Sequence, residues 1–185
     1  MVACLLLVSC GSSVRATPSA SPSLPADWSV RDAAGLRITA PAAWGAPDVL
    51  SATDASGGPR AWIVFHEPSG SEALAIMTWR DTTAAAVAAA QYGSELPQGD
   101  RTEVTLGGGG GARRAIAVTG YAQWHDATAG GTYECRHLFV QVTPMLVADV
   151  IACGARINGT ATPTPELRAV QEQVALRIGV AGGAP

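Results

Sequence analysis

The side chains best suited to acid–base or metal chemistry are those of the three histidines, His66, His125 and His137. Each has a carboxylate near it in the sequence: Glu67, Asp126 and Glu134, respectively. An imidazole and a carboxylate can share a proton or a metal ion only when both side chains reach the same point. Residues one or three positions apart on a regular strand point to opposite faces. We therefore expect none of these pairs to form a site, and we predict no catalytic residues, no metal and no cofactor.

Two further patterns with possible chemistry also favour ordinary structure. The five glycines Gly107–Gly111 could cradle a phosphate, but phosphate loops lead into a helix N-terminus. Here Arg113, Arg114, Ala115 and Ile116 follow, which is typical of a strand, so we predict a hairpin connection. Serine hydrolysis is not favoured, because the chain lacks a Gly-x-Ser-x-Gly motif. An enzyme with a site assembled from His, Arg and carboxylates on separate strands stays open as the alternative to a binding protein.

The N-terminus carries a short apolar run, Leu5 to Val8, followed by Ser9 and Cys10. The sequence Leu7-Val8-Ser9-Cys10 resembles the lipobox of bacterial lipoproteins. That resemblance implies a signal peptide over residues 1–9 and acylation of Cys10 by a diacylglyceryl group and a fatty acid such as palmitate. Several acyl chains give stable anchoring where one is marginal. The N-terminal sequence differs from a usual leader in having no basic residue before the apolar run, so we expect the true start codon to lie upstream. The alternative is an apolar N-terminal strand with a chance cysteine.

Composition divides the rest of the chain into a tether, one domain and a tail. Residues 11–26 are rich in Ser, Pro, Ala and Thr, a composition that cannot bury enough surface to fold. Residues 27–180 are long enough for one globular domain, and residues 181–185 form a disordered tail. The net charge of -3 and the scattered arginines argue against a nucleic-acid partner.

Alternating apolar residues and turn signals predict an antiparallel arrangement of strands with two helices. The expected strands are Trp28–Val30, Leu36–Ala40, Ala61–Glu67, Ala73–Arg80, Arg101–Leu106, Ala112–Trp124, Thr132–Val142 and Leu146–Cys153. An alanine-rich helix should follow the cap at residues 81–83 and end at Gly93. A second helix should begin after Thr164 and end at Gly179, with an apolar stripe formed by Leu167, Val170, Val174 and Ile178.

The hairpin around Pro144 allows a register to be derived. A three-residue loop, 143–145, places Val142 opposite Leu146, and continuing outward places Cys135 opposite Cys153. These are the two cysteines outside the leader, and paired cysteines outside the cytoplasm usually oxidise. We predict a Cys135–Cys153 disulfide, with two unlinked buried thiols as the alternative.

The order of elements from residue 27 to residue 180, including Gly35-Leu36-Arg37-Ile38 followed by Pro41-x-x-Trp44, resembles the PsbP-like fold of actinobacterial cell-envelope lipoproteins. That resemblance implies an α+β fold in which an antiparallel β-sheet is flanked by helices, an α/β/α sandwich. It also implies an adaptor or assembly role rather than catalysis, and no catalytic residues are carried over.

The expected location is therefore the extracytoplasmic face of the cell membrane, with an envelope protein, glycan or lipid as the partner. Trp124 and His125 are the candidate partner contacts, because they precede a glycine-rich connection between the two longest expected strands.

Overall fold

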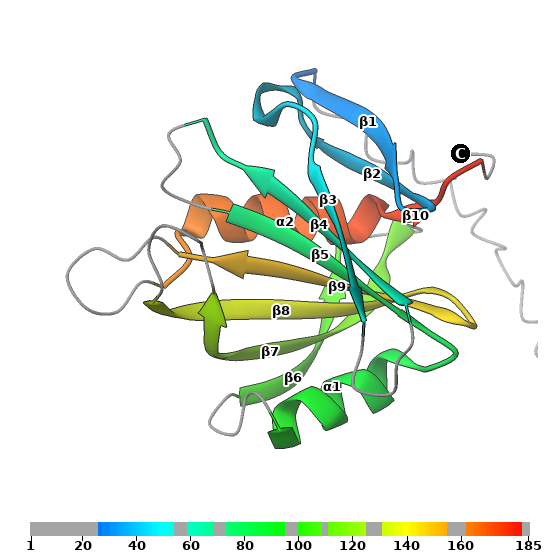
Figure 1. Ribbon diagram of the computed structural model, residues 1–185, viewed down its shortest axis with the longest axis vertical. Helices are drawn as coiled ribbons and strands as arrows, with labels where there is room; N and C mark the ends of the chain where they lie inside the picture. Colours follow the sequence, from blue (N-terminus) through cyan, green and yellow to red (C-terminus); the bar gives the residue numbers. More distant parts are fainter. Residues whose placement is uncertain are drawn as a thin grey trace, which may run out of the picture.

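Two antiparallel sheets and two helices form the part of the chain that the computed structural model describes, residues 26–53, 59–68, 73–94, 100–108, 111–124, 131–154 and 162–182 (Figure 1). The strands are β1 (Trp28–Ala33), β2 (Leu36–Pro41), β3 (Asp48–Thr53), β4 (Pro59–His66), β5 (Ala73–Arg80), β6 (Asp100–Leu106), β7 (Arg113–Trp124), β8 (Gly131–Thr143), β9 (Leu146–Cys153) and β10 (Gly179–Val180). The helices are α1 (Ala84–Ser94) and α2 (Pro165–Arg177), and a short 3-10 turn, η1 (Ala42–Trp44), follows β2.

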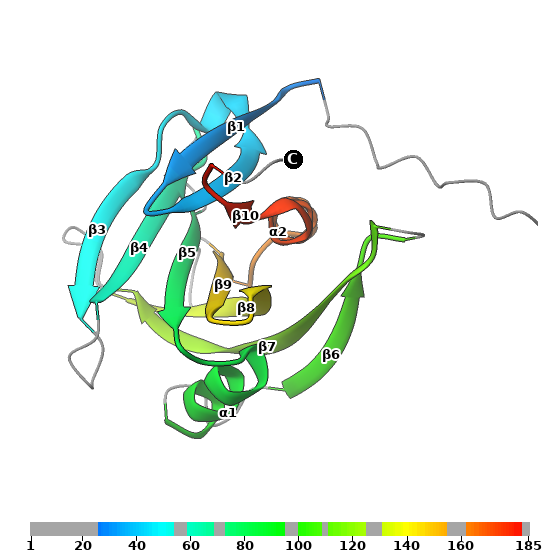
Figure 2. The same ribbon diagram turned by 90° about the vertical axis from the view of Figure 1, so that its right-hand side faces the viewer.

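Seven strands form the large sheet, in the order β3-β4-β5-β9-β8-β7-β6, and β1, β2 and β10 form a small sheet. Every neighbouring pair is antiparallel. The large sheet is strongly curved, with α2 on its concave side and α1 on its convex side (Figure 2). The fold is therefore α+β, with an antiparallel sheet flanked by helices, as the sequence predicts.

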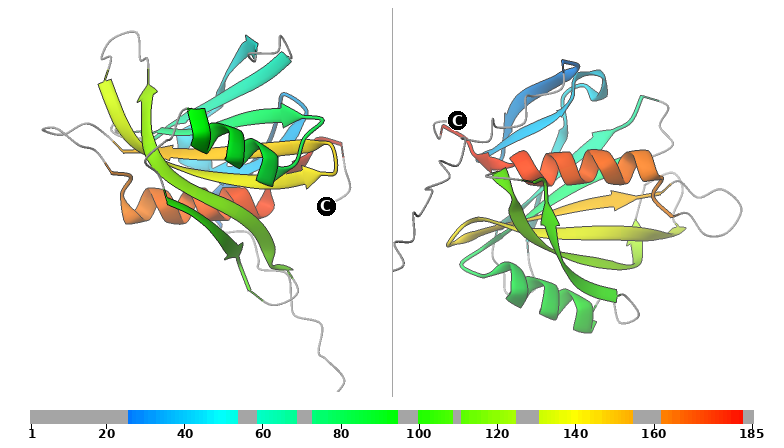
Figure 3. Two further views of the ribbon diagram at one scale, coloured as in Figure 1. Left: turned by 90° about the horizontal axis from the view of Figure 1, so that it is seen from below. Right: turned by 180° about the vertical axis from the view of Figure 1, so that it is seen from behind.

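Strand β8 shows how the two faces of the large sheet are divided. Leu138 and Val140 pack in the main core with residues of α2, whereas Phe139 packs in a second core with Val87 of α1. Because successive strand residues point to opposite faces, this alternation places the two helices on opposite sides of the sheet (Figure 3). The sheet is thus buried on both faces where it meets the helices, which explains the near-continuous apolar sequence of β9.

Helix α2 forms as its sequence signals predict, with a correction at its end. The Thr164 hydroxyl accepts a hydrogen bond from the Leu167 amide at 3.1 Å, and Pro165 occupies the first turn. Leu167 and Val174 are buried, as expected from the apolar stripe. The helix ends at Arg177, so that Ile178 lies in the C-cap and still enters the core.

The same end of α2 is fastened by a half-buried arginine. Arg113, the first residue of β7, donates to the carbonyl oxygens of Ala175 at 3.2 Å and Ile178 at 2.6 Å. Its other terminal nitrogen donates to the Gln141 carbonyl at 2.9 Å, and burial lowers the pKa of Arg113 below its usual value. A cation at the C-terminus of a helix satisfies carbonyls that have no partner within the helix.

The glycine-rich loop joins two paired strands. Leu106 lies opposite Arg113 at the ends of β6 and β7, so the loop is a hairpin connection, which confirms the prediction. Gly107 has a φ of +70°, and a Cβ there would lie 3.0 Å from the Cδ2 atom of Leu176 on α2. The glycine at this position therefore serves a turn and a close helix contact rather than phosphate binding.

Two strands were not expected from the sequence. Edge strand β3 carries Asp48 and Ser51, and its Val49 and Leu50 side chains are exposed, so no alternation of buried apolar residues marks it as a strand in the sequence. Strand β10 has only two residues, and its place depends on pairing with Leu36 and Arg37 of β2. Both strands are therefore set by neighbouring strands more than by their own sequence.

Candidate functional site

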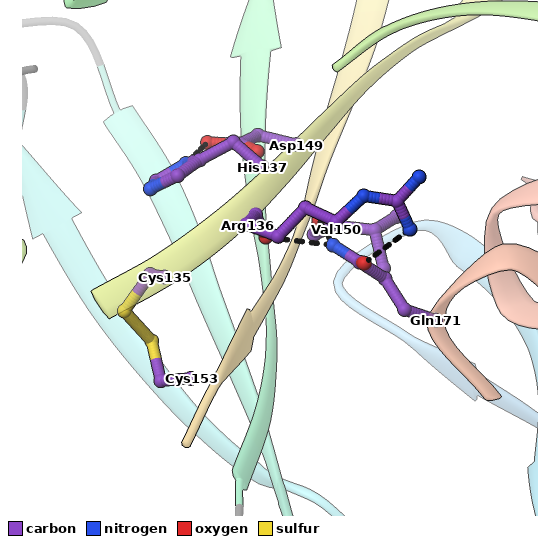
Figure 4. Close-up of a disulfide and its surroundings, with 7 residues drawn as sticks. All are labelled: Cys135, Arg136, His137, Asp149, Val150, Cys153 and Gln171. Carbon is purple, nitrogen blue, oxygen red and sulfur yellow. Dashed lines mark hydrogen bonds and ion pairs between the residues drawn. A yellow bond between two sulfur atoms is a disulfide. The ribbon is translucent and has the colours of Figure 1, made fainter. Parts of the chain in front are cut away.

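The β8–β9 hairpin carries the predicted disulfide at the end of the pairing that lies furthest from the turn. Cys135 and Cys153 lie directly opposite each other, with their Cα atoms 4.3 Å apart, and their sulfur atoms are bonded (Figure 4). Both residues are buried. The disulfide predicted from the register is thus confirmed, and its burial shields it from small thiols in solution.

The turn that sets this register differs from the expected one. Thr143, not Val142, pairs with Leu146, so that the turn has two residues, and an irregularity between Gln141 and Thr143 adds one residue to β8. The Gln141 side-chain amide stabilises this bulge by donating to the carbonyl oxygens of Thr143 at 2.5 Å and Leu146 at 3.3 Å. A shorter turn and an extra strand residue compensate each other, so the register is restored from Gln141 outward.

A buried histidine–aspartate pair lies on the same face of the hairpin as the disulfide. His137 Nδ1 is 3.0 Å from Asp149 Oδ2, and the relative exposures of the two side chains are 8% and 1%. The imidazole also stacks on Phe139, with ring centroids 5.9 Å apart. This partner of His137 comes from the neighbouring strand, two residues away from the residue directly opposite, Ile151 (Figure 4).

The chemistry open to this pair follows from which of its atoms already have partners. A carboxylate bonded to Nδ1 fixes the orientation of an imidazole and leaves Nε2 to act on a substrate, as in hydrolytic triads. In the described part of the chain, however, His137 Nε2 and Asp149 Oδ1 are buried without a hydrogen-bond partner. By register, the neighbours of His137 on this face include Val118 and Ile151, which supply no nucleophile.

The opposite face of the hairpin is joined to α2 by a buried glutamine. Gln171 is fully buried, and its side-chain amide donates to the carbonyls of Arg136 and Val150, each at 2.7 Å (Figure 4). Its amide oxygen accepts from the Arg136 guanidinium at 3.2 Å, and that guanidinium also forms an ion pair with Glu172 at 2.9 Å. These contacts fix helix and hairpin relative to each other, and thereby position the strands that carry the pair and the disulfide.

The other histidine in the described residues is exposed. His66 Nε2 lies 3.4 Å from Asp48 Oδ2, and their side-chain exposures are 61% and 72%. The carboxylate again comes from the neighbouring strand and not from the sequence neighbour Glu67. An ion pair as exposed as this one is worth little, because water screens it.

The remaining predicted site residues lie at the edge of the described residues or outside them. Trp124 is the last residue of β7, and its side chain is not described. His125 and Cys10 lie outside the described residues. The structure does place the ends of β7 and β8 next to each other, since Trp124 lies opposite Gly131.

Clusters of metal ligands and membrane-spanning helices are both absent from the described residues. No group of three or more His, Cys, Asp or Glu side chains there could hold a metal ion. Nor does any helix in those ranges have the length and hydrophobicity to cross a bilayer.

Comparison with known proteins identified no relative of this chain. No family model matches the chain, and no curated protein matches it.

Proposed function

We propose that this chain is a lipid-anchored protein on the extracytoplasmic face of a bacterial membrane, and that its domain binds an envelope partner as an adaptor. The observation that carries the proposal is the buried Cys135–Cys153 disulfide. Disulfides form and persist outside the cytoplasm and are rare within it. The lipobox-like sequence ending at Cys10 supports the same compartment.

We further propose that the domain is PsbP-like, and the arrangement of its elements supports this. Helices on opposite faces of an antiparallel sheet agree with the α/β/α layers of the PsbP-like fold, and the helix that closes the domain at its C-terminus agrees with the order of elements. We infer an adaptor role because that family is used in assembly more than in catalysis.

Lipidation of the chain is expected to depend entirely on Cys10. In a bacterium that processes lipoproteins, Cys10→Ala should leave an uncleaved precursor without acyl mass, because the sulfur is the attachment point. Cys4→Ala is the matched control, since Cys4 lies in the same leader, and it should be processed normally. Mass spectrometry of the membrane fraction is the measurement. A mature chain that starts elsewhere, or an unmodified Cys10 thiol, would refute the anchor.

Partner contact is expected near Trp124, where the two longest strands hold the connecting segment. A photoreactive amino acid replacing Trp124 should crosslink a defined envelope component in intact cells. The same amino acid replacing Met145 is the control, because Met145 is 57% exposed in the turn at the other end of β8. Crosslinking from both positions alike, or from position 145 alone, would contradict the proposed contact.

An enzyme is the second candidate, and the His137–Asp149 pair is the observation that favours it. The carboxylate could hold the imidazole in the orientation that a general base requires. A substrate would then have to reach Nε2, which is buried in this structure. If the chain is a binding protein, the His137–Asp149 pair is only a polar contact within the sheet, and the fold does not have to open for the chain to function.

A further inference from the structure

A small pocket lies on the convex side of the large sheet, where the first turn of α1 approaches strands β6, β7 and β8. Its volume is about 280 Å³. Ile116 and Phe139 line it on the sheet side, and Ala84 and Ala85 line it on the helix side. The pocket is thus apolar over most of its wall and is at the small end of the range for ligand sites.

Two side chains of opposite charge, those of Glu103 and Arg114, are also part of the lining of this pocket. Glu103 of β6 lies directly opposite Ile116, and Arg114 precedes Ile116 by two residues, so all three share one face of the sheet. Both charged residues are exposed, and neither forms an ion pair or hydrogen bond within the described residues. A guanidinium and a carboxylate therefore stand beside one apolar surface, each available to a ligand.

Two of the amides at the start of α1 already have partners within the chain. The Ala84 amide donates to Gln141 Oε1 at 2.9 Å, and the Ala86 amide donates to the Thr83 hydroxyl at 3.2 Å. A simple anion would meet Arg114 but would be repelled by Glu103. A molecule that carries both charges satisfies both side chains, and an apolar group on it would cover Ile116.

We propose that this pocket binds a small zwitterion, an α-amino acid with a short aliphatic side chain. Its carboxylate accepts from the Arg114 guanidinium, for which a bidentate geometry is available. Its ammonium group donates to Glu103, and its side chain packs on Ile116. The site is on the α1 side of β7, and it uses neither the disulfide nor the His137–Asp149 pair.

The test is a titration of the full chain with L-valine, followed through the backbone amide signals of Ala85, Ile116 and Gln141 by nuclear magnetic resonance. We expect saturable shifts at these amides. Arg114→Gln and Glu103→Gln should each weaken binding by about tenfold or more, since each removes one charged hydrogen bond. N-acetyl-L-valine and L-valinamide, which each lack one of the two charges, should bind correspondingly weakly.

Arg101→Gln is the matched control, because Arg101 is an exposed arginine of β6 on the same face as Glu103 and lies outside the pocket lining. It should bind L-valine like the unaltered chain. All three substitutions are at exposed positions, so unchanged thermal unfolding verifies that the variants are folded. Absence of saturable shifts with L-valine, or binding that survives the combined Arg114→Gln and Glu103→Gln substitutions, overturns the proposal.

Discussion

Replacing His137 with leucine is expected to lower the free energy of unfolding by about 3 to 5 kcal/mol. The reason is the Asp149 carboxylate, which is 1% exposed and has His137 as its hydrogen-bond partner in the described structure. Without the imidazole the carboxyl group is left buried with no hydrogen-bond partner in the described structure, and burying an unpaired polar group costs free energy. Asp149→Val should cost less, about 1 to 3 kcal/mol, because it leaves an imidazole that can be neutral.

The combined His137→Leu and Asp149→Val substitutions are expected to be less damaging than His137→Leu alone. Two apolar side chains of similar size leave no polar atom unpaired, and such exchanges of buried pairs are often neutral or stabilising. Urea unfolding of the two single variants and the double variant measures the coupling free energy. Additive losses would mean that the two side chains are solvated independently, which contradicts the buried pair. If the chain is an enzyme that uses His137, the double variant should be as stable as expected above but should have lost its activity.

The partner of His137 could have been identified from the sequence. The register that predicts the disulfide also places His137 opposite Ile151, and therefore puts Asp149 on the same face, diagonally across the strand pair. Glu134, the carboxylate near His137 in the sequence, belongs to the opposite face of β8 and was correctly excluded as its partner. Proximity along the chain was a poor guide because strand pairing brings together residues that are distant in sequence.

The buried glutamine of α2 is harder to foresee. Gln171 lies four residues after Leu167 and three before Val174, so it occupies the apolar stripe of the helix. Glutamine is usually exposed, and only the position of α2 over the Arg136 and Val150 carbonyls explains its burial. Helix periodicity predicts which face is buried, but not that the strand beneath offers acceptors to a polar side chain.

The agreement at the disulfide likewise has a physical reason. The predicted three-residue loop and the observed two-residue turn with a bulge at Val142 contain the same number of residues between Gln141 and Val147. Pairing beyond the turn depends on that number, and so Cys135 and Cys153 meet in both cases. The local turn geometry was wrong, while the face of each strand residue from Gln141 outward was right.

Removing the disulfide by the combined Cys135→Ala and Cys153→Ala substitutions is expected to lower stability by about 3 kcal/mol. The bond closes a loop between residues 18 apart, and its loss restores the freedom of that segment in the unfolded chain. For a domain of this size the melting temperature should fall by about 10 °C. Thermal unfolding with and without a thiol reductant is the measurement.

Treatment with a reductant shows how much of the stability change comes from loss of the S–S bond and how much comes from replacing the cysteine side chains. Because both sulfurs are buried, the native chain should react only when the strands open, so reduction should be slow below the unfolding transition. Once reduced, the unaltered chain should unfold near the melting temperature of the double-alanine variant, and that variant should not respond to reductant at all. A variant that melts like the oxidised chain would show that the β8–β9 pairing needs no covalent closure. Slow reduction with the expected loss of stability would instead show that the bond serves the stability of the fold and not a redox reaction.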